Sequence, residues 1–177
     1  GLQNIVGNVV SGLVILAERP VSVGDRIEVA GVAGNVTRIR LRNTVVVTND
    51  NISIIVPNSE LTSHPITNWS HGDLRVRVRI PIGVAYGSDV ELLRKSMNEV
   101  ALANSEVLAT PAPALFFDHF GDSSLNFELA VWTSSMSRSP RRFRSDLNYA
   151  IERKLREIGI EIPFPQRVVH MRPTPPS

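Results

Sequence analysis

Serine, histidine and aspartate occur together in one short segment, and these residue types can form the catalytic centre of a hydrolase. They are His119, Asp122, Ser123 and Ser124. A nucleophile, its base and the group that orients the base normally come from separate loops, and a GxSxG elbow often presents the nucleophile. These four residues instead lie within one predicted hairpin, and the chain has no GxSxG sequence. We therefore predict no catalytic residue here and no enzymatic activity.

Sequence patterns for metals and cofactors are also missing. Cysteine is absent, which removes thiolate nucleophiles, thiolate metal sites and disulfides, and fits a reducing compartment such as the cytoplasm. The histidines show no metal-ligand spacing; they are His64, His71, His119 and His170. No GxxxxGK or dinucleotide fingerprint occurs, and GVAGNV is more typical of a hairpin turn. We predict no metal site and no cofactor.

Arginines alternate with apolar residues along two predicted strands. The rows are Arg38, Arg40 and Arg42, and Arg75, Arg77 and Arg79. Each row presents positive charge on one sheet face, so a soluble Sm-like or OB-like nucleic-acid-binding module is the alternative function. No aromatic residue on which a base can stack precedes Trp69, and we predict no nucleic-acid partner. Solvated sheet faces, or charges that bias ion entry, are the open explanations.

The first 16 residues predict an amphipathic helix. Its small, uncharged polar face is Asn4, Gly7, Asn8, Ser11 and Gly12, and its apolar face is Leu2, Val6, Val9, Leu13 and Leu16. Such a polar face favours close packing and hydrogen bonds to a neighbouring helix, although a core helix is the alternative. The apolar segment has about 15 residues, fewer than the ~20 that a bilayer core requires. We expect the chain to be a piece of a longer protein.

Residues 17–66 predict a small β-barrel of the Sm or OB type. Pro20 ends the first helix, and four runs rich in β-branched residues follow at 24–31, 35–43, 44–50 and 51–58. Gly31 and Gly34 predict one turn, and residues 49–51 predict a hairpin. About five short strands in this length are typical of such a barrel. No helical periodicity occurs in this segment.

Residues 67–166 predict an α/β unit, so the fold class is α+β. Strands are predicted at 75–84, 114–120 and 125–132. One helix begins with a capping box of Ser88 and Glu91, and a second begins with Ser139 as N-cap and ends at Gly159. With residues 167–171 counted as a last strand, the order is the β-α-β-β-α-β of a ferredoxin-like domain.

Six stretches together resemble the small-conductance mechanosensitive ion channel (MscS) family. They are GNVVSGLVIL, ERPVSVGDRIEVAGVAGNV, TNDNISIIVPNSEL, IGVAYGSDVE, FGDSSLNFELAVW and GIEIPFPQ. Each stretch alone is a weak signal, but all six occur in the family's order and spacing across nearly the whole chain. The resemblance also agrees with the division into units predicted from periodicity.

The resemblance implies that the chain is part of a tension-gated channel that releases ions and small osmolytes on hypo-osmotic shock. Residues 1–16 would be the lower half of the third, pore-lining membrane helix, 17–66 the β-domain and 67–166 the α/β domain. Earlier membrane helices would precede Gly1. Seven copies would form a cage in the cytoplasm below a pore in the bacterial inner membrane. The implied partners are further copies of the chain, membrane lipid and permeant ions.

The resemblance also implies functional residues. The residues implied in packing and gating of the pore helix are Asn4, Gly7, Asn8, Ser11 and Gly12. Those implied in its contact with the β-domain are Pro57, Asn58 and Ser59. Gly12 permits close packing or a bend, and Asn8 can hydrogen-bond to the contact residues; ordinary helix packing is the alternative role. Residues 167–177 would be a tail and a strand of a seven-stranded barrel between subunits, against the ferredoxin-like count. That strand contains Arg167, Val168, Val169, His170 and Met171.

Overall fold

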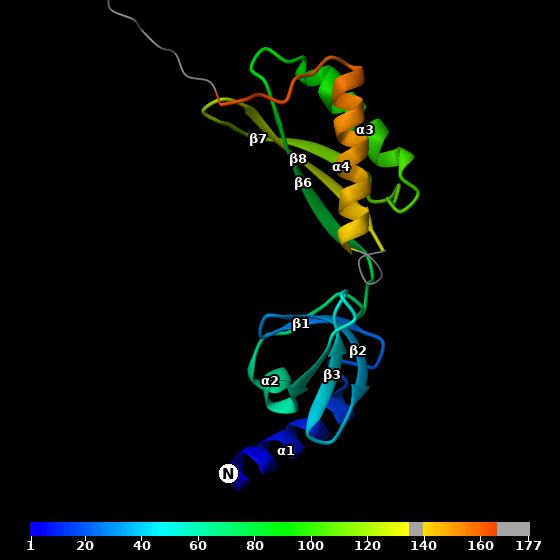
Figure 1. The fold of residues 1–177 in the computed structure, drawn as a ribbon. Helices are drawn as coiled ribbons and strands as arrows, with labels where there is room; N and C mark the ends of the chain where they lie inside the picture. The colour runs from blue at the N-terminus through cyan, green and yellow to red at the C-terminus, as the bar shows by residue number, and fades with distance from the viewer. Residues whose placement is uncertain (135–139, 166–177) are drawn as a thin grey trace, which may run out of the picture. The chain divides into compact units, whose positions relative to one another are not determined.

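The computed structural model describes residues 1–134 and 140–165. These residues form two compact units (Figure 1). The first comprises Gly1–Val76, and the second comprises Arg77–Thr133 together with α4 (Pro140–Glu157) from Arg141 onward. Each unit has its own set of buried apolar side chains, so the two are described in turn.

The first unit begins with α1 (Leu2–Glu18), in which only Gly12 and Ile15 are buried. Val9 is half-buried, and the other large apolar side chains are between 38% and 77% exposed: Leu2, Ile5, Val6, Val10, Leu13, Val14 and Leu16. The helix ends because Arg19 is left-handed (φ 51°) and its N–H donates to the carbonyl of Ile15. Among the helices of the described residues, none is both long and apolar enough to cross a membrane. The predicted N-terminal helix is present, and little of its apolar surface is covered by the chain itself.

Five short strands form the sheet of the first unit. They are β1 (Arg26–Val29), β2 (Val32–Ile39), β3 (Asn43–Val47), β4 (Ser53–Pro57) and β5 (Thr67–Asn68). Their order is β4-β3-β2-β1-β5, and every neighbouring pair is antiparallel. The first four strands therefore form a meander, and the short β5 pairs with the free edge of β1.

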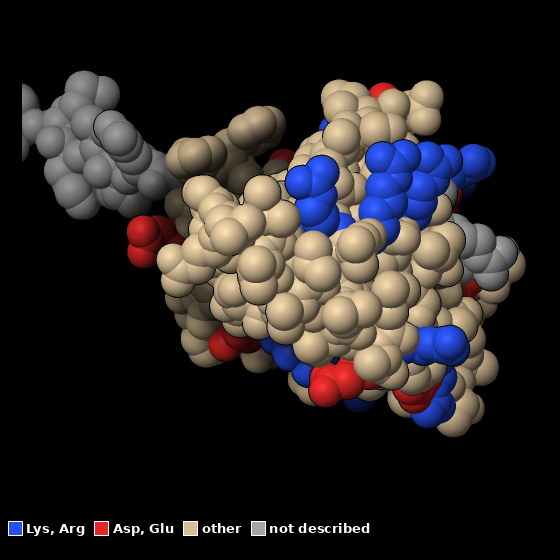
Figure 2. Space-filling model, turned by 90° about the horizontal axis from the view of Figure 1, so that it is seen from below, with Lys and Arg blue, Asp and Glu red and all other residues tan. Residues whose placement is uncertain are grey.

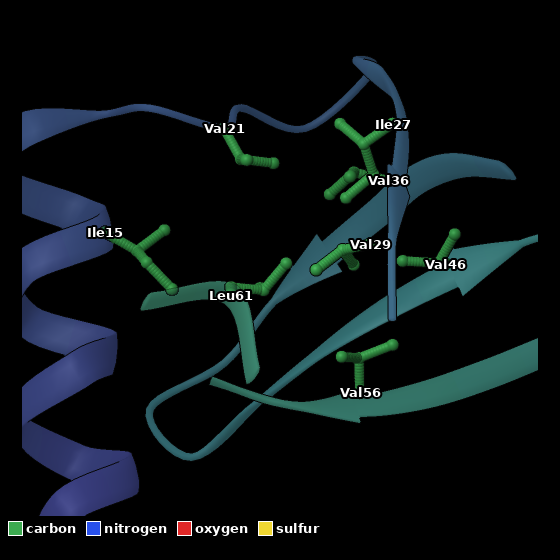
Figure 3. Close-up of a cluster of buried hydrophobic side chains, with 8 residues drawn as sticks. All are labelled: Ile15, Val21, Ile27, Val29, Val36, Val46, Val56 and Leu61. Carbon is green, nitrogen blue, oxygen red and sulfur yellow. The ribbon is translucent and has the colours of Figure 1, made fainter. Parts of the chain in front are cut away.

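The core of the first unit joins this sheet to two helices. Alternation along the strands aims every second side chain inward, as in β3, where Thr44 and Val46 are fully buried. The buried apolar set is Ile15, Val21, Ile27, Val29, Val36, Val46, Val56 and Leu61. Figure 3 shows these side chains pointing toward a shared interior from α1, the loop after it, the strands and the short α2 (Asn58–Ser63). Ile15 is the only large side chain that α1 contributes to this set.

Two features of the first unit differ from the sequence prediction. The helix α2 was not predicted, because six residues with one buried apolar side chain, Leu61, are too short to show a helical period. Gly34 lies inside β2 and not in a turn; the turn is formed by Ala30 and Gly31, which both have positive φ. A Cβ at Gly34 would lie 2.4 Å from the carbonyl oxygen of Val47 on β3. The glycine is therefore needed for close strand approach, and a sequence pattern does not separate that reason from a turn.

A buried arginine ties the sheet to one of its turns. Arg26 is 5% exposed, and its Nη1 donates to Oδ1 of Asn49 (2.9 Å) and of Asn35 (3.4 Å). Burial lowers the pKa of this guanidinium, since the charged form loses hydration. The two amide oxygens offset part of that loss and connect β1 to β2 and to the β3–β4 turn.

The second unit is a three-stranded sheet with two helices. Its elements are β6 (Val76–Val84), α3 (Val90–Ala103), β7 (Ala114–Phe120), β8 (Leu125–Thr133) and α4. The sheet order is β6-β8-β7, and Figure 1 shows α3 and α4 on one side of it. The buried face of α4 repeats at every fourth residue through Phe143, Leu147, Ile151 and Leu155. This is the predicted α+β fold, and the predicted strand at 167–171 lies outside the described residues.

The predicted cap of α3 is wrong by one residue. Asp89 is the N-cap, and its carboxylate accepts from the N–H of Leu92 (3.0 Å). The hydroxyl of Ser88 instead donates to the carbonyl of Ala85 (2.6 Å). Serine and aspartate are both common N-cap residues, but here the hydroxyl of Ser88 bonds within the turn that precedes the helix. The predicted cap at Ser139 lies outside the described residues.

Candidate functional site

The polar face of α1 lies against α2, and Asn8 connects the two helices. The side-chain Oδ1 of Asn8 accepts a hydrogen bond from the backbone N–H of Ser59 (3.0 Å). Its Nδ2 donates to the carbonyl of Asn4 one turn earlier (2.8 Å), which fixes the orientation of the amide. Ser59 is in the first turn of α2, where N–H groups have no partner inside the helix. Asn8 therefore satisfies a backbone donor that α2 cannot satisfy itself.

One turn further along α1, Gly12 allows the helix to approach the sheet closely. A Cβ built on Gly12 would lie 2.2 Å from the carbonyl oxygen of Leu41 and 2.6 Å from Nδ2 of Asn58. Leu41 belongs to the turn between β2 and β3. Any side chain larger than hydrogen would separate α1 from this turn.

The buried side chain of Asn58 holds the β2–β3 turn in place at this contact. It is fully buried, its Nδ2 donates to the carbonyls of Arg40 (2.9 Å) and Leu41 (3.1 Å), and its Oδ1 accepts from the hydroxyl of Thr44 (2.9 Å). The backbone N–H of Asn58 also donates to the carbonyl of Arg42 (3.1 Å). A buried amide with this many partners cannot move without leaving polar groups unpaired.

Ser11 and Ile15 make further contacts of α1. The hydroxyls of Ser11 and Thr62 are 2.8 Å apart, and Ile15 enters the core. Gly7 has open space around it, with nothing within 4 Å of a Cβ built there. Most of the side chains by which α1 is held are thus small or polar, and Ile15 is its one fully buried large side chain. A contact of this kind can separate and re-form with less loss of hydrophobic burial than a core helix.

The histidine, aspartate and serine segment lies in the β7–β8 hairpin, with His119 near the end of β7 and residues 121–124 in the turn. Nδ1 of His119 is 2.9 Å from Asp118, and its Nε2 is 3.2 Å from Nδ2 of Asn126. The hydroxyl of Ser124 donates to Oδ1 of Asn126 and not to the imidazole. The side chains of His119 and Asp118 are 62% and 66% exposed. No water-excluding cleft surrounds the imidazole, and the predicted turn is present. Within the described residues, no group of three or more potential ligands could hold a metal ion.

Two segments of the chain match a known family. Residues 4–71 match the β-domain of mechanosensitive ion channels, and residues 78–162 match the C-terminal domain of the mechanosensitive ion channel MscS. Together these matches cover most of the chain. The chain belongs to the MscS family of mechanosensitive ion channels.

Proteins of this family that resemble the chain are named as channels. Over 171 residues the chain is 40% identical to the mechanosensitive channel MscK of Escherichia coli K12, covering 97% of the chain and 15% of MscK. It is 31% identical over 170 residues to the small-conductance mechanosensitive channel of Edwardsiella ictaluri, covering 96% of the chain and 58% of that protein. The chain therefore spans only part of these MscS-family relatives.

A solved MscS-family structure has the same fold. The closed-state crystal structure of Helicobacter pylori MscS superposes with a TM-score of 0.88 at 27% identity, covering 98% of this chain and 68% of the other. The predicted family and fold class are confirmed, and these matches give no support to the nucleic-acid-binding alternative.

The structure brings together residues that the sequence proposed and residues that it did not. Asn8, Ser11 and Gly12 lie at the contact with Asn58 and Ser59. Gly7 has nothing within 4 Å of a Cβ built on it, and Pro57 lines a neighbouring groove with Asn4. Sequence reasoning did not find Leu41, Thr44 and Thr62, because a turn carbonyl and two threonines in ordinary local sequence carry no distinguishing pattern. The predicted barrel strand, residues 167–171, lies outside the described residues.

Proposed function

We propose that this chain is the pore-adjacent and cytoplasmic part of a tension-gated channel in a bacterial inner membrane. When tension rises on hypo-osmotic shock, the whole protein would release ions and small osmolytes. Membership of the MscS family supports this proposal. The helix α1 has one charged residue, Glu18 at its C-terminal end, and an apolar face that the chain leaves exposed, which also fits a position beside a membrane and a pore.

The proposed gating mechanism depends on the contact of α1 with α2 and with the turn between β2 and β3. In one state α1 is docked through Asn8, Ser11 and Gly12, and in the other it is displaced from Asn58 and Ser59. Tension favours the state with the larger area in the membrane plane, so gating is a shift of population between two packings. The small and polar residues at this contact support the proposal, because displacement of α1 removes one large buried apolar side chain, Ile15, from the core. Dewetting of a hydrophobic constriction upstream would keep the closed pore non-conducting.

Assembly of identical subunits completes the proposal. We expect seven copies around one axis, with residues 167–171 of each copy closing a barrel that removes every free strand edge. The α/β unit would form the wall of a cage below the pore. The mass of the detergent-solubilised full-length protein would measure the copy number, and a monomer would contradict the assembly.

Electrical recording tests the proposed activity. The full-length protein that contains this chain is expressed in bacteria that lack their own mechanosensitive channels, and suction is applied to membrane patches. We expect currents that appear above a tension threshold, together with improved survival of hypo-osmotic shock relative to cells with an empty vector. Patches that contain the protein but stay silent up to membrane rupture would refute the channel function.

A further inference from the structure

The chain that leaves α1 is held by the side chain of Asn68 on β5. The Nδ2 of Asn68 donates to the carbonyl of Pro20 (3.1 Å), just after the helix, and to Oδ2 of Asp25 (2.8 Å). The same Oδ2 accepts from the backbone N–H of Ser22 (2.9 Å). One amide group therefore bonds at two points to the segment that connects α1 with β1. We call Pro20, Asp25 and Asn68 the C-terminal anchor of α1.

The amide of Asn68 fits this position in one orientation only. Its Oδ1 accepts from the backbone N–H of Ser70 (2.9 Å). The carbonyl of Pro20 and the carboxylate of Asp25 offer only acceptors, so they need the amide nitrogen, whereas the N–H of Ser70 needs the oxygen. The backbone of Asn68 pairs with Ile27 on β1. The C-terminal anchor is therefore attached to the sheet itself, and an amide flip would leave its groups without partners.

Apolar burial of α1 is greatest at the same end. Ile15 and Val21, on either side of the helix end, are 0% and 1% exposed, and Figure 3 shows both pointing into the core. At the other end of the helix, Leu2 and Val6 are 77% and 54% exposed. Figure 2 views the molecule from below, where α1 lies in Figure 1, and shows a broad area without charged side chains. Hydrogen bonds and apolar burial thus both hold the C-terminal end of α1.

We propose that Asn68 is a positioning residue for gating, which fixes the C-terminal end of α1 while the rest of the helix leaves Asn58 and Ser59. This inference rests on the proposed function, in which α1 moves between a docked and a displaced position. With one end fixed, the displacement is a rotation of α1 around the C-terminal anchor. The bonds of Asn68 then stay intact in both positions.

A small rotation around the C-terminal anchor is enough to open the docked contact. Asn8 lies about 18 Å before Pro20, at about 1.5 Å per residue. A rotation of about 10° would move Asn8 by about 3 Å, which breaks its hydrogen bond of 3.0 Å to Ser59. Arg19, whose left-handed backbone ends the helix, lies where the chain would turn. Hinges commonly use such residues at the end of an element.

Hydrogen exchange in the full-length protein that contains this chain tests the fixed end. Gly12→Ala places a Cβ 2.2 Å from a backbone carbonyl oxygen and so pushes α1 out of its contact. The N–H of Ser59 reports that contact, and the N–H groups of Ser22 and Ser70 report the C-terminal anchor. We expect exchange about fivefold faster or more at Ser59, with a change of less than about twofold at Ser22 and Ser70. Loss of protection at all three amides together would show that α1 leaves as a whole, and would overturn the inference.

Asn68→Asp tests the amide directly. The substitution keeps an oxygen for the N–H of Ser70 but replaces the donor with a second carboxylate oxygen, 2.8 Å from Asp25. Two carboxylates in contact repel each other, so the C-terminal anchor should open. We expect exchange about tenfold faster at Ser22 and Ser59, from the loss of about two hydrogen bonds. In membrane patches the tension threshold should change as well.

Two further variants separate a positioning role from a general loss of stability. Asn104→Asp adds the same charge in the second unit, where the side-chain oxygen still accepts from the N–H of Glu106, and should leave exchange at Ser22 unchanged. The double variant Asp25→Asn, Asn68→Asp exchanges the carboxylate and the amide, so that a donor again faces an acceptor. We expect it to recover most of the protection at Ser22 and to return the threshold toward that of the unsubstituted protein. Independent damage from two substitutions would add, so a double variant worse than Asn68→Asp would overturn the inference.

Failure of the C-terminal anchor and failure of the channel give different results. Silent patches for the unsubstituted protein would refute the channel function, whatever the exchange pattern. Tension-gated currents together with unchanged exchange and threshold in Asn68→Asp would refute the C-terminal anchor alone. If Asn68→Asp does not fold, the exchange pattern of Gly12→Ala still decides between a fixed end and a helix that leaves as a whole.

Discussion

Replacing Gly12 with alanine perturbs the α1 contact at its tightest point. The new Cβ would lie 2.2 Å from the carbonyl oxygen of Leu41 and 2.6 Å from Nδ2 of Asn58, whereas ordinary contact begins at 3.4 Å. Asn58 cannot yield without breaking hydrogen bonds to two carbonyls, and Leu41 contributes backbone and not a flexible side chain. The helix itself must therefore move away by about 1 Å, because close-packed groups cannot interpenetrate.

Gly7 provides a matched control on the same helix. Nothing lies within 4 Å of a Cβ at Gly7, so Gly7→Ala adds the same methyl group without a clash. Both substitutions favour α1 by about 1 kcal/mol through helix propensity. Gly12→Ala also incurs an overpacking cost of about 1–3 kcal/mol. The difference in α1 docking free energy between the two variants is thus the steric cost alone, about 1–3 kcal/mol.

Hydrogen exchange at the amide of Ser59 measures this difference, because that N–H donates to Oδ1 of Asn8 only while α1 is docked. We expect exchange in Gly12→Ala to be about 5- to 150-fold faster than in Gly7→Ala, the ratio that corresponds to 1–3 kcal/mol. In the full-length channel the same pair should differ in tension threshold. Equal protection of Ser59 in the two variants would refute the argument that Gly12 is needed for close approach.

Three further predictions concern buried hydrogen bonding, pH and assembly. Thr44→Val removes the hydroxyl that donates to Asn58 in a fully buried pair, and the first unit should lose about 1–3 kcal/mol of unfolding free energy in urea. Hydrogen bonds from Arg75 lower the pKa of exposed Asp73 to about 2, so an NMR titration should find that midpoint, rising toward the ordinary value in Arg75→Gln. The stabilisation from this pair is complete above the unfolded carboxyl pKa and is lost as pH falls through about 2. Deleting residues 167–177 should weaken assembly in light scattering while circular dichroism retains both helices of the second unit.

Each of these three predictions would be contradicted by a particular result. Thr37→Val is the control for Thr44→Val, because the Thr37 hydroxyl donates to a carbonyl at the exposed surface; equal losses would show that burial of the pair is unimportant. An Asp73 midpoint that stays low in Arg75→Gln would assign the pKa shift to another cause. An oligomer that survives the deletion would return residues 167–171 to the subunit's own sheet, as the ferredoxin-like count has it.

Several elements were predictable from local sequence because their causes are local. The four-residue spacing of Phe143, Leu147, Ile151 and Leu155 predicts α4 and its buried face, and the structure confirms both. The β-branched runs predict the strands of the first unit, and the hairpin at 49–51 has the left-handed residue, Asn51, that such a turn uses. Family membership was also accessible, since six motifs in order are a property of the sequence itself.

Other features were hidden because their causes are distant in the chain. Position 31 requires glycine because its φ is positive. Position 34 requires glycine because a Cβ there would clash with a carbonyl on the neighbouring strand. Both looked like turn residues in the sequence. The short helix α2 has one buried apolar side chain, Leu61, and its first turn donates to an amide acceptor on α1. One leucine shows no helical period, and the acceptor on α1 is distant in the sequence.

The candidate site divides in the same way. The sequence alone determined that α1 is a helix with a small, uncharged polar face that includes Asn8, Ser11 and Gly12, because residue type and helical period decide this. Only the tertiary structure decided what that face meets, since the carbonyl of Leu41 is placed at Gly12 by the buried amide of Asn58. Backbone carbonyls are identical at every position of a sequence, so the choice of one of them as a contact depends on how the turn is folded and held.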